Sequence, residues 1–196
     1  MTDCLTKWKA EFSNQIQQPA LAEDLKRAAL SEELSSWTSS LTTAVVRSCE
    51  SLGWDAAAKW NLSNRLPQPG KEYLSIDVTA LPSKEKRDIP WPLPAAVFEL
   101  ENHRKDVRVA YSLWKVLCVR AMLRVVIAFR PDWERTRQLV GHLQEQVIGG
   151  LTPEQRVTLG GETVVVIGNR GEGETFPWGY FKFWKLDTNL GRFEKA

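Results

Sequence analysis

The chain has 196 residues, of which 43% are hydrophobic and 26% are charged. This balance is that of a globular protein, and it excludes a disordered, collagen-like or disulfide-scaffold chain. The 26 basic and 24 acidic side chains leave a formal net charge of +2, so nucleic acid would have to be held by a local basic cleft rather than by bulk charge. With only two histidines, any metal is expected to sit on carboxylates rather than in a histidine-rich zinc centre.

The cysteines and the N-terminal segment bear on the cellular compartment. Cys4, Cys49 and Cys118 are far apart and form no CxxC pair, so we interpret them as inert thiols. The first thirty residues mix charged and amide side chains, unlike a signal peptide. The longest apolar candidate, Val116 to Phe129, is interrupted by two arginines and is too polar for a membrane helix. The sequence therefore predicts a soluble, cytoplasmic protein with no membrane partner.

The N-terminal part of the chain is predicted to be helical. Residues 1–31 are expected to form a helical extension, with one helix over Leu21 to Leu30. A longer helix is expected over Glu32 to Leu52, where apolar residues recur at steps of three and four. Ser31 is expected to cap this helix at its N-terminus, and Gly53 to end it.

After a loop rich in Pro and Gly, the hydrophobic period changes to two, which predicts β-strands. The first strand is expected over Glu72 to Leu81. Its alternation places Ile76 and Val78 on one face and Asp77 on the other. The second strand, Ala96 to Glu101, follows the same pattern, apolar on one face and acidic on the other.

The remaining elements alternate between helix and strand. A helix over Val107 to Ala121 and a strand over Arg124 to Phe129 predict a parallel pair with the preceding strand. Another helix is expected over 131–149, and strands over Thr163 to Gly168 and Gly179 to Leu186 are expected to form a C-terminal β-hairpin. The fold class predicted is α/β, a mixed central β-sheet flanked by helices, in a single domain that spans the chain.

Three acidic residues, Asp77, Glu99 and Glu101, are the candidate metal ligands. Neighbouring strands lie about 5 Å apart and can present carboxylates side by side, which suits Mg²⁺ or Mn²⁺. Such an ion lowers the pKa of a bound water and neutralises charge on a phosphate. The alternative is that these acids only solvate the outer face of a hairpin. Against it, Asp and Glu are poor strand formers.

At these residues the sequence resembles the restriction-endonuclease-like PD-(D/E)XK superfamily. Asp77 stands in Leu-Ser-Ile-Asp-Val, and Glu99 and Glu101 stand in Val-Phe-Glu-Leu-Glu-Asn. Together with Leu-Trp-Lys-Val around Lys115, this is similar to uncharacterised members that have a Glu-x-Glu-Asn strand and a Trp-Lys helix. The superfamily core is helix, three strands, helix and strand (αβββαβ). The resemblance covers residues 32–130, to which 131–196 adds a C-terminal helix and strands.

The resemblance implies a Mg²⁺-dependent nuclease that hydrolyses phosphodiester bonds. Asp77, Glu99 and Glu101 would be its metal ligands, and Lys115 would complete the catalytic set. The family's lysine follows the glutamate by two residues, where this chain has Glu101; Lys115 matches members in which the lysine has moved to the next helix. At about 100° per residue, Lys115 lies away from the apolar face of its helix, either at the site or on a solvated stripe. The motif's proline is replaced by Ile76.

Two further residues are candidates of the acidic site. Glu50 matches a position where some members of the superfamily place another acid, or it lies on a helix surface. His103 continues the alternation of Glu99 and Glu101 as a ligand or base, or it lies in the loop after the strand.

Basic and aromatic side chains are candidates for contacts with DNA or RNA. Two basic groups could flank the acidic cleft and contact phosphates: Lys84, Lys86 and Arg87, and Arg104, Lys105 and Arg108. The C-terminal aromatic residues 176–184 could stack bases or pack in the core. Because they occupy both faces of one strand, a partner subunit could cover the second face, as in a homo-oligomer.

Two functions remain open at this stage. The first is the metal-dependent nuclease. The second is a catalytically inactive module on the same fold that binds a protein or nucleic acid, as the missing lysine at position 101 would suggest.

Overall fold

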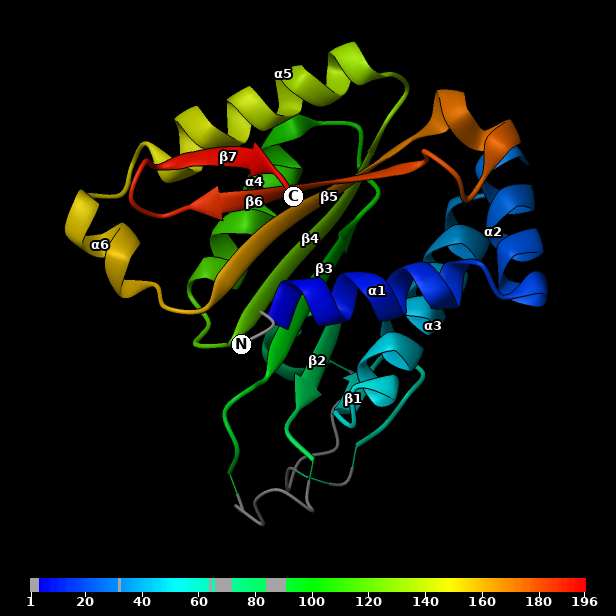
Figure 1. Cartoon of the computed structure of the whole chain (residues 1–196), viewed down its shortest axis with the longest axis horizontal. Helices are drawn as coiled ribbons and strands as arrows, with labels where there is room; N and C mark the ends of the chain where they lie inside the picture. Colours follow the sequence, from blue (N-terminus) through cyan, green and yellow to red (C-terminus); the bar gives the residue numbers. More distant parts are fainter. Residues whose placement is uncertain (1–3, 32, 64, 66–71, 84–90) are drawn as a thin grey trace.

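The computed structural model describes residues 4–31, 33–63, 65, 72–83 and 91–196. The strands in this part of the chain are β1 (Asp55–Ala58), β2 (Val78–Leu81), β3 (Ala96–Glu101), β4 (Leu123–Arg130), β5 (Glu162–Asn169), β6 (Phe181–Asp187) and β7 (Arg192–Lys195). They form one seven-stranded sheet in which each strand lies beside the next along the chain (Figure 1). The central strands β3, β4 and β5 are parallel, and the outer pairs are antiparallel. The predicted α/β fold with a mixed sheet is confirmed.

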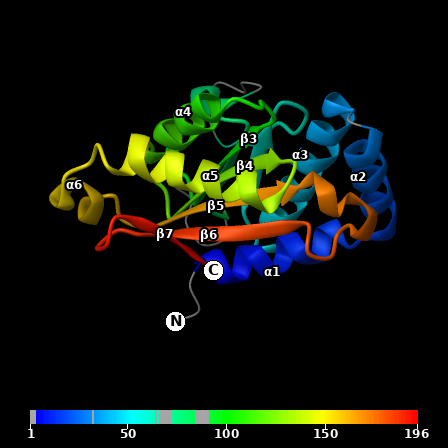
Figure 2. The same ribbon diagram turned by 90° about the horizontal axis from the view of Figure 1, so that it is seen from above.

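Helices cover both faces of this sheet. They are α1 (Cys4–Ile16), α2 (Pro19–Ser31), α3 (Leu34–Ser51), α4 (Asp106–Leu117), α5 (Trp133–Leu143) and α6 (Pro153–Thr158), with the short 3-10 turns η1 (Tyr73–Ser75) and η3 (Arg170–Thr175) and a π-helical turn η2 (Gln144–Ile148). Figure 2 shows α1 on one side of the sheet and α4 and α5 on the other. The alternation along β3 follows from this layering, because Phe98 packs in the core beneath α1 and α3 while Val97 packs in the core beneath α4.

Burial on both faces explains why the central strands read as continuous apolar runs. All eight residues of β4 are buried, including Arg124. The Arg124 guanidinium donates hydrogen bonds to the carbonyls of Val119, Leu159 and Gly160 at 2.8–2.9 Å. The buried guanidinium therefore has hydrogen-bond partners within the protein. The predicted parallel pairing of residues 96–101 with 124–129 is confirmed.

The first predicted strand is partly wrong. The strand begins at Val78 rather than Glu72, because Tyr73–Ser75 forms a 3-10 turn in which Leu74 and Ser75 have positive φ angles of 57° and 55°. The alternation does not extend through this turn. Ile76 therefore packs in the core beneath α4, and Val78 packs in the opposite core. The prediction that these two residues share a face is wrong.

Other boundaries also differ from the predictions. Ser31 is the last residue of α2, and the N-cap of α3 is Glu33. The helix expected over Val107 to Ala121 ends at Leu117, where the chain turns toward β4. The short elements β1, α6 and β7 were not predicted. In β1 the sequence Asp-Ala-Ala-Ala has little intrinsic preference for a strand, and pairing with β2 decides its conformation.

Most of the C-terminal aromatic residues pack against this chain itself, whereas Trp178 is exposed. The predicted hairpin is present as the antiparallel pair β5 and β6, which β7 extends. Phe183 contacts Trp8 and Phe12 of α1 on one face of β6, and Trp184 joins the core beneath α4 and α5 on the other. The aromatic pattern of β6 thus needs no partner subunit, and a homo-oligomer stays a prediction.

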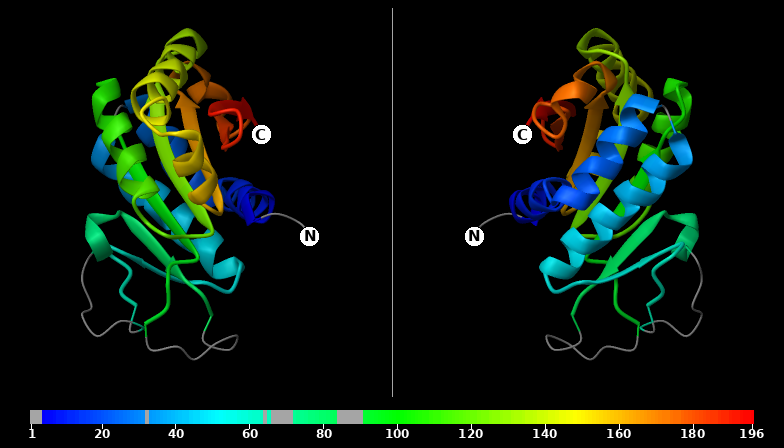
Figure 3. Two further views of the ribbon diagram at one scale, coloured as in Figure 1. Left: turned by 90° about the vertical axis from the view of Figure 1, so that its left-hand side faces the viewer. Right: turned by 90° about the vertical axis from the view of Figure 1, so that its right-hand side faces the viewer.

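The two ends of the described chain lie close together. Lys9 of α1 donates a hydrogen bond to the carbonyl of Ala196 at 2.7 Å, and both ends lie on the α1 side of the sheet (Figure 3). Among the described helices, none is both long enough and apolar enough to cross a bilayer.

Candidate active site

The acidic residues Asp77 and Glu99 lie at the junction of β2, β3 and α4. In the antiparallel register of β2 and β3, Val78 is opposite Phe98, so the next position outward brings Asp77 beside Glu99. The backbone N–H of Leu100 donates to Asp77 Oδ2 at 2.7 Å, which fixes this carboxylate against β3. The sequence correctly placed these two acids together, although Asp77 lies one residue before the strand rather than within it.

Lys115 reaches this pair from α4. Its Nζ lies 2.7 Å from Glu99 Oε1 and donates to the carbonyl of Ser75 at 2.6 Å. The Lys115 side chain is 22% exposed and that of Glu99 only 6%. The structure therefore places Lys115 at the acidic site and not on a solvated stripe of the helix.

Ser112 is a member of this site that the sequence analysis missed. It is buried on α4, one turn before Lys115, and its hydroxyl acts to lower the pKa of the Glu99 carboxyl. The signal for it was the spacing i, i+3 to Lys115, which places two side chains on the same side of a helix.

Burial dominates the electrostatics of the site. It raises the pKa of Glu99 to about 7, against the opposing effect of the hydrogen bond from Lys115 and with a further upward contribution from Asp77. Burial also raises the pKa of Asp77, opposed by the N–H of Leu100, and the nearby carboxylate of Glu72 adds to the increase. The two acids thus form a pair whose combined negative charge Lys115 offsets only in part.

Glu101 lies at the rim of this site, where β3 ends. Its Oε1 accepts a hydrogen bond from the backbone N–H of His103 at 2.8 Å, and its Oε2 lies 3.9 Å from Arg108 Nε. The ring of His103 is exposed, and its Nδ1 accepts from the N–H of Lys105 at 3.0 Å, so it shapes the loop after the strand. Glu50 is exposed at the end of α3 and is not among the charges that shift Asp77 or Glu99.

The donor set was tested for its fit to a divalent cation. Within the described part of the chain, no group of three or more His, Cys, Asp and Glu side chains stands ready to hold a metal ion. Mg²⁺, however, is commonly bound through one or two carboxylates, with waters and substrate phosphates as the other ligands. The carboxylate oxygens of Asp77 and Glu99 match that requirement in chemistry and number, and Glu101 is engaged at the rim instead.

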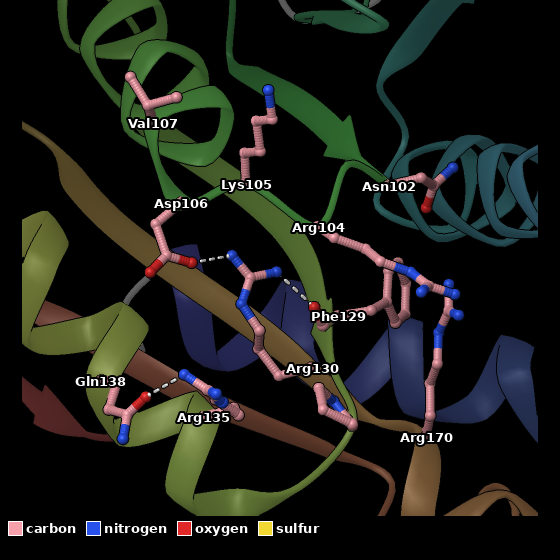
Figure 4. Close-up of a pocket in the computed structure, with 11 residues that line it drawn as sticks. Asn102, Arg104, Lys105, Asp106, Val107, Phe129, Arg130, Arg135, Gln138 and Arg170 are labelled. Atoms are coloured by element: carbon pink, nitrogen blue, oxygen red, sulfur yellow. Dashed lines mark hydrogen bonds and ion pairs between the residues drawn. The ribbon is translucent and has the colours of Figure 1, made fainter.

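The predicted basic residues separate into three groups. Lys84, Lys86 and Arg87 fall outside the described residues. Arg108 is exposed beside Glu101. Arg104 and Lys105 line a cavity of about 730 Å³ at the carboxyl ends of the parallel strands (Figure 4).

This cavity also contains basic residues that the sequence analysis missed, namely Arg130, Arg135 and Arg170. They come from the end of β4, from α5 and from η3. No short motif links them in the sequence, so only the sheet topology brings them together.

Comparison of the sequence with protein-family models and with curated proteins finds no match to this chain.

Proposed function

We propose that this protein is a Mg²⁺-dependent nuclease of the PD-(D/E)XK type, which hydrolyses phosphodiester bonds in DNA or RNA. The observation that carries the proposal is the contact of 2.7 Å between Lys115 Nζ and Glu99 Oε1. It joins a lysine from the helix after the acidic strand to a carboxylate that lies beside Asp77. This is the arrangement expected if the family's lysine has moved to that helix.

The order of elements supports the same proposal. From α3 to β4 the chain runs helix, three strands, helix and strand. This is the order of the superfamily's core, and it includes β1, the strand that the sequence analysis did not predict.

The residues of the site have distinct roles in this mechanism. Asp77 and Glu99 would hold the ion, which when bound activates a water and neutralises charge on the scissile phosphate. Lys115 supplies a fixed positive charge beside Glu99 and can donate hydrogen bonds to the attacking water or to a phosphate oxygen. Ser112 is a buried polar neighbour that favours the ionised form of Glu99.

Two exposed aromatic side chains on α4 support a nucleic-acid substrate. Tyr111 is 53% exposed and Trp114 is 55% exposed, and their rings stack on each other with their centroids 5.9 Å apart. They belong to the helix that supplies Lys115 and Ser112. Exposed aromatic rings beside a phosphate-directed site can stack on unpaired bases.

The proposal is tested by incubating plasmid DNA, single-stranded DNA and RNA with the protein and Mg²⁺ or Mn²⁺. We expect cleavage that EDTA stops and that Asp77→Ala abolishes. Asp24→Ala, which alters an exposed acid of α2 paired with Arg27, is the matched control and should cleave like the wild type. Equal cleavage by wild type and Asp77→Ala would contradict the proposal.

The second candidate is an inactive module that binds a protein or nucleic acid. It is favoured by Glu101, which stands where the family's lysine would be and is engaged with His103 and Arg108. The two candidates differ in metal binding. Mn²⁺ binding that Glu99→Gln abolishes supports the nuclease, whereas nucleic-acid binding with neither metal binding nor cleavage supports the module.

A further inference from the structure

The basic cavity is a second site, separate from the acidic one. Five basic side chains, Arg104, Lys105, Arg130, Arg135 and Arg170, and one carboxylate, Asp106, line its volume of about 730 Å³. It lies where β3 and β4 end, and in open α/β sheets the carboxyl ends of parallel strands are the usual place for ligands. For a chain whose net charge is only +2, this is a strong local excess of positive charge.

Arg130 is a buried residue of the cavity wall, held in place by two contacts. It is only 5% exposed, its Nη2 lies 2.5 Å from Asp106 Oδ1, and its Nη1 donates to the carbonyl of Phe129 at 2.5 Å. The one lining carboxylate is thus already paired with the most buried cation. Arg135, in contrast, donates to the neutral side chain of Gln138 at 2.9 Å. Among the side chains that line the cavity, basic groups therefore outnumber acidic ones.

The N-terminus of α4 adds to this potential. Lys105 is the N-cap of this 12-residue helix and makes no side-chain capping hydrogen bond. Lys105, Asp106 and Val107 all line the cavity, so the positive end of the helix dipole lies at its wall. Figure 4 shows the guanidinium groups of Arg104 and Arg170 directed toward one another beside the ring of Phe129. Both side chains thus bring a guanidinium group to the same part of the cavity wall.

The geometry points to a phosphate monoester of nucleotide size as the ligand of this cavity. Several arginines suit a polyvalent oxyanion, because each guanidinium can donate two parallel hydrogen bonds to phosphate oxygens. The volume exceeds that of a phosphate group alone and lies within the usual range of small-ligand pockets, and Phe129 and Val107 provide apolar surface for the rest of the molecule. The phosphate monoester belongs to a free nucleotide or to the 5′-phosphorylated end of a strand.

This inference does not depend on the proposed nuclease. The two sites share α4 but no side chain, and the nine steps from Asp106 to Lys115 span about 14 Å of helix at 1.5 Å per residue. Binding in the cavity can therefore be measured without metal and in a variant that lacks Asp77.

The test is calorimetric titration in EDTA with AMP, adenosine and inorganic phosphate. We expect AMP to bind, adenosine not to bind, and phosphate to compete with AMP. The double variant Arg104→Gln/Arg135→Gln should weaken AMP binding by about ten-fold or more, since each removed guanidinium takes away charge-assisted hydrogen bonds. Both side chains are exposed, so the variant is expected to fold. Arg137→Gln, an exposed arginine of α5 outside the cavity, is the matched control and should bind like the wild type.

A second titration distinguishes the two sources of the phosphate. A 5′-phosphorylated oligonucleotide that binds more tightly than its 5′-hydroxyl form, and that AMP displaces, identifies the end of a strand as ligand. AMP binding without such a difference identifies a free nucleotide. Failure of both AMP and the phosphorylated oligonucleotide to bind the wild type, or equal binding by wild type and the double variant, would overturn the inference. An Asp77→Ala variant that no longer cleaves but still binds AMP would support the inference that the cavity is a separate site.

Discussion

The acidic site and the basic cavity lie at two places along the same helix and carry opposite charge. The acidic site holds the buried carboxylate of Glu99, the half-buried carboxylate of Asp77 and one lysine. The cavity holds five basic side chains and one carboxylate, which is already paired with Arg130. The first has the charge to attract a cation and the second the charge to attract an anion, although both lie on one α/β framework.

The two sites also differ in how the chain assembles them. The acidic site comes from β2, β3 and α4, which follow one another in the sequence. The cavity takes residues from the loop after β3, the end of β4, α5 and η3. Sites of the first kind leave a short motif in the sequence, and sites of the second kind do not.

The largest expected effect comes from Lys115. Lys115→Met should lower the Mg²⁺-dependent cleavage rate about 100-fold, because it removes a preorganised positive charge at the reacting phosphate. The measurement is kcat on plasmid or oligonucleotide substrates. Lys185→Met is the control, since Lys185 makes a comparable ion pair with Glu162 at 2.5 Å elsewhere on the sheet. Equal rates in the two variants would show that Lys115 has a structural role only.

The second-largest expected effect is on AMP binding, and it tests whether the two sites are independent. Arg104→Gln/Arg135→Gln should weaken AMP binding by about ten-fold, and Asp77→Ala should leave it unchanged, because the acidic site shares no side chain with the cavity. Calorimetry on both variants decides this point. Weaker AMP binding in Asp77→Ala would mean that the acidic site and the cavity act as one.

The pH dependence of stability tests the acidic pair without metal. The pKa of Glu99 is about 7 in the folded protein, above its ordinary value of 4.5, so the folded state binds more protons than the unfolded state between these values. The free energy of unfolding should therefore decrease as the pH rises from about 4.5 to about 7, and the raised pKa of Asp77 acts in the same direction. Urea denaturation in EDTA measures this dependence.

Glu99→Gln is the variant for this measurement. In this variant the free energy of unfolding should decrease less between pH 4.5 and about 7, because glutamine does not titrate. Glu194→Gln, which alters an exposed residue of β7, is the control and should keep the pH dependence of the wild type. An unchanged pH dependence in Glu99→Gln would show that Glu99 is not the group responsible.

The smallest expected effect comes from Ser112. Ser112→Ala removes a hydroxyl that favours the ionised form of Glu99, and it should lower the cleavage rate by about ten-fold or less, with a loss of stability of about 1 kcal/mol. Ser48→Ala is the control, since Ser48 is also buried on a helix but donates only to backbone carbonyls of α3. Ser48→Ala should affect stability alone. A cleavage rate in Ser112→Ala equal to that of Ser48→Ala would remove Ser112 from the site.

Much of the fold could be predicted from local pattern. The parallel pairing of β3 and β4 followed from the strand–helix–strand order, and the two faces of β3 followed from its alternation. The errors arose where local pattern and tertiary structure disagree. Ile76 lies beyond the 3-10 turn, so its alternation with Val78 was not that of a continuous strand. In β1, three alanines carry almost no strand signal, and pairing with β2 determines their conformation.

The sequence by itself determined the α/β class and which acids to expect on the two strands, because hydrophobic periodicity depends on neighbours along the chain. Only the tertiary structure decided where Lys115 points, since a helix position opposite the apolar face can meet either solvent or a side chain of the adjacent strand. It alone also brought Arg104, Arg135 and Arg170 together around one cavity. These contacts join residues far apart in the sequence, and sheet order rather than local pattern sets them.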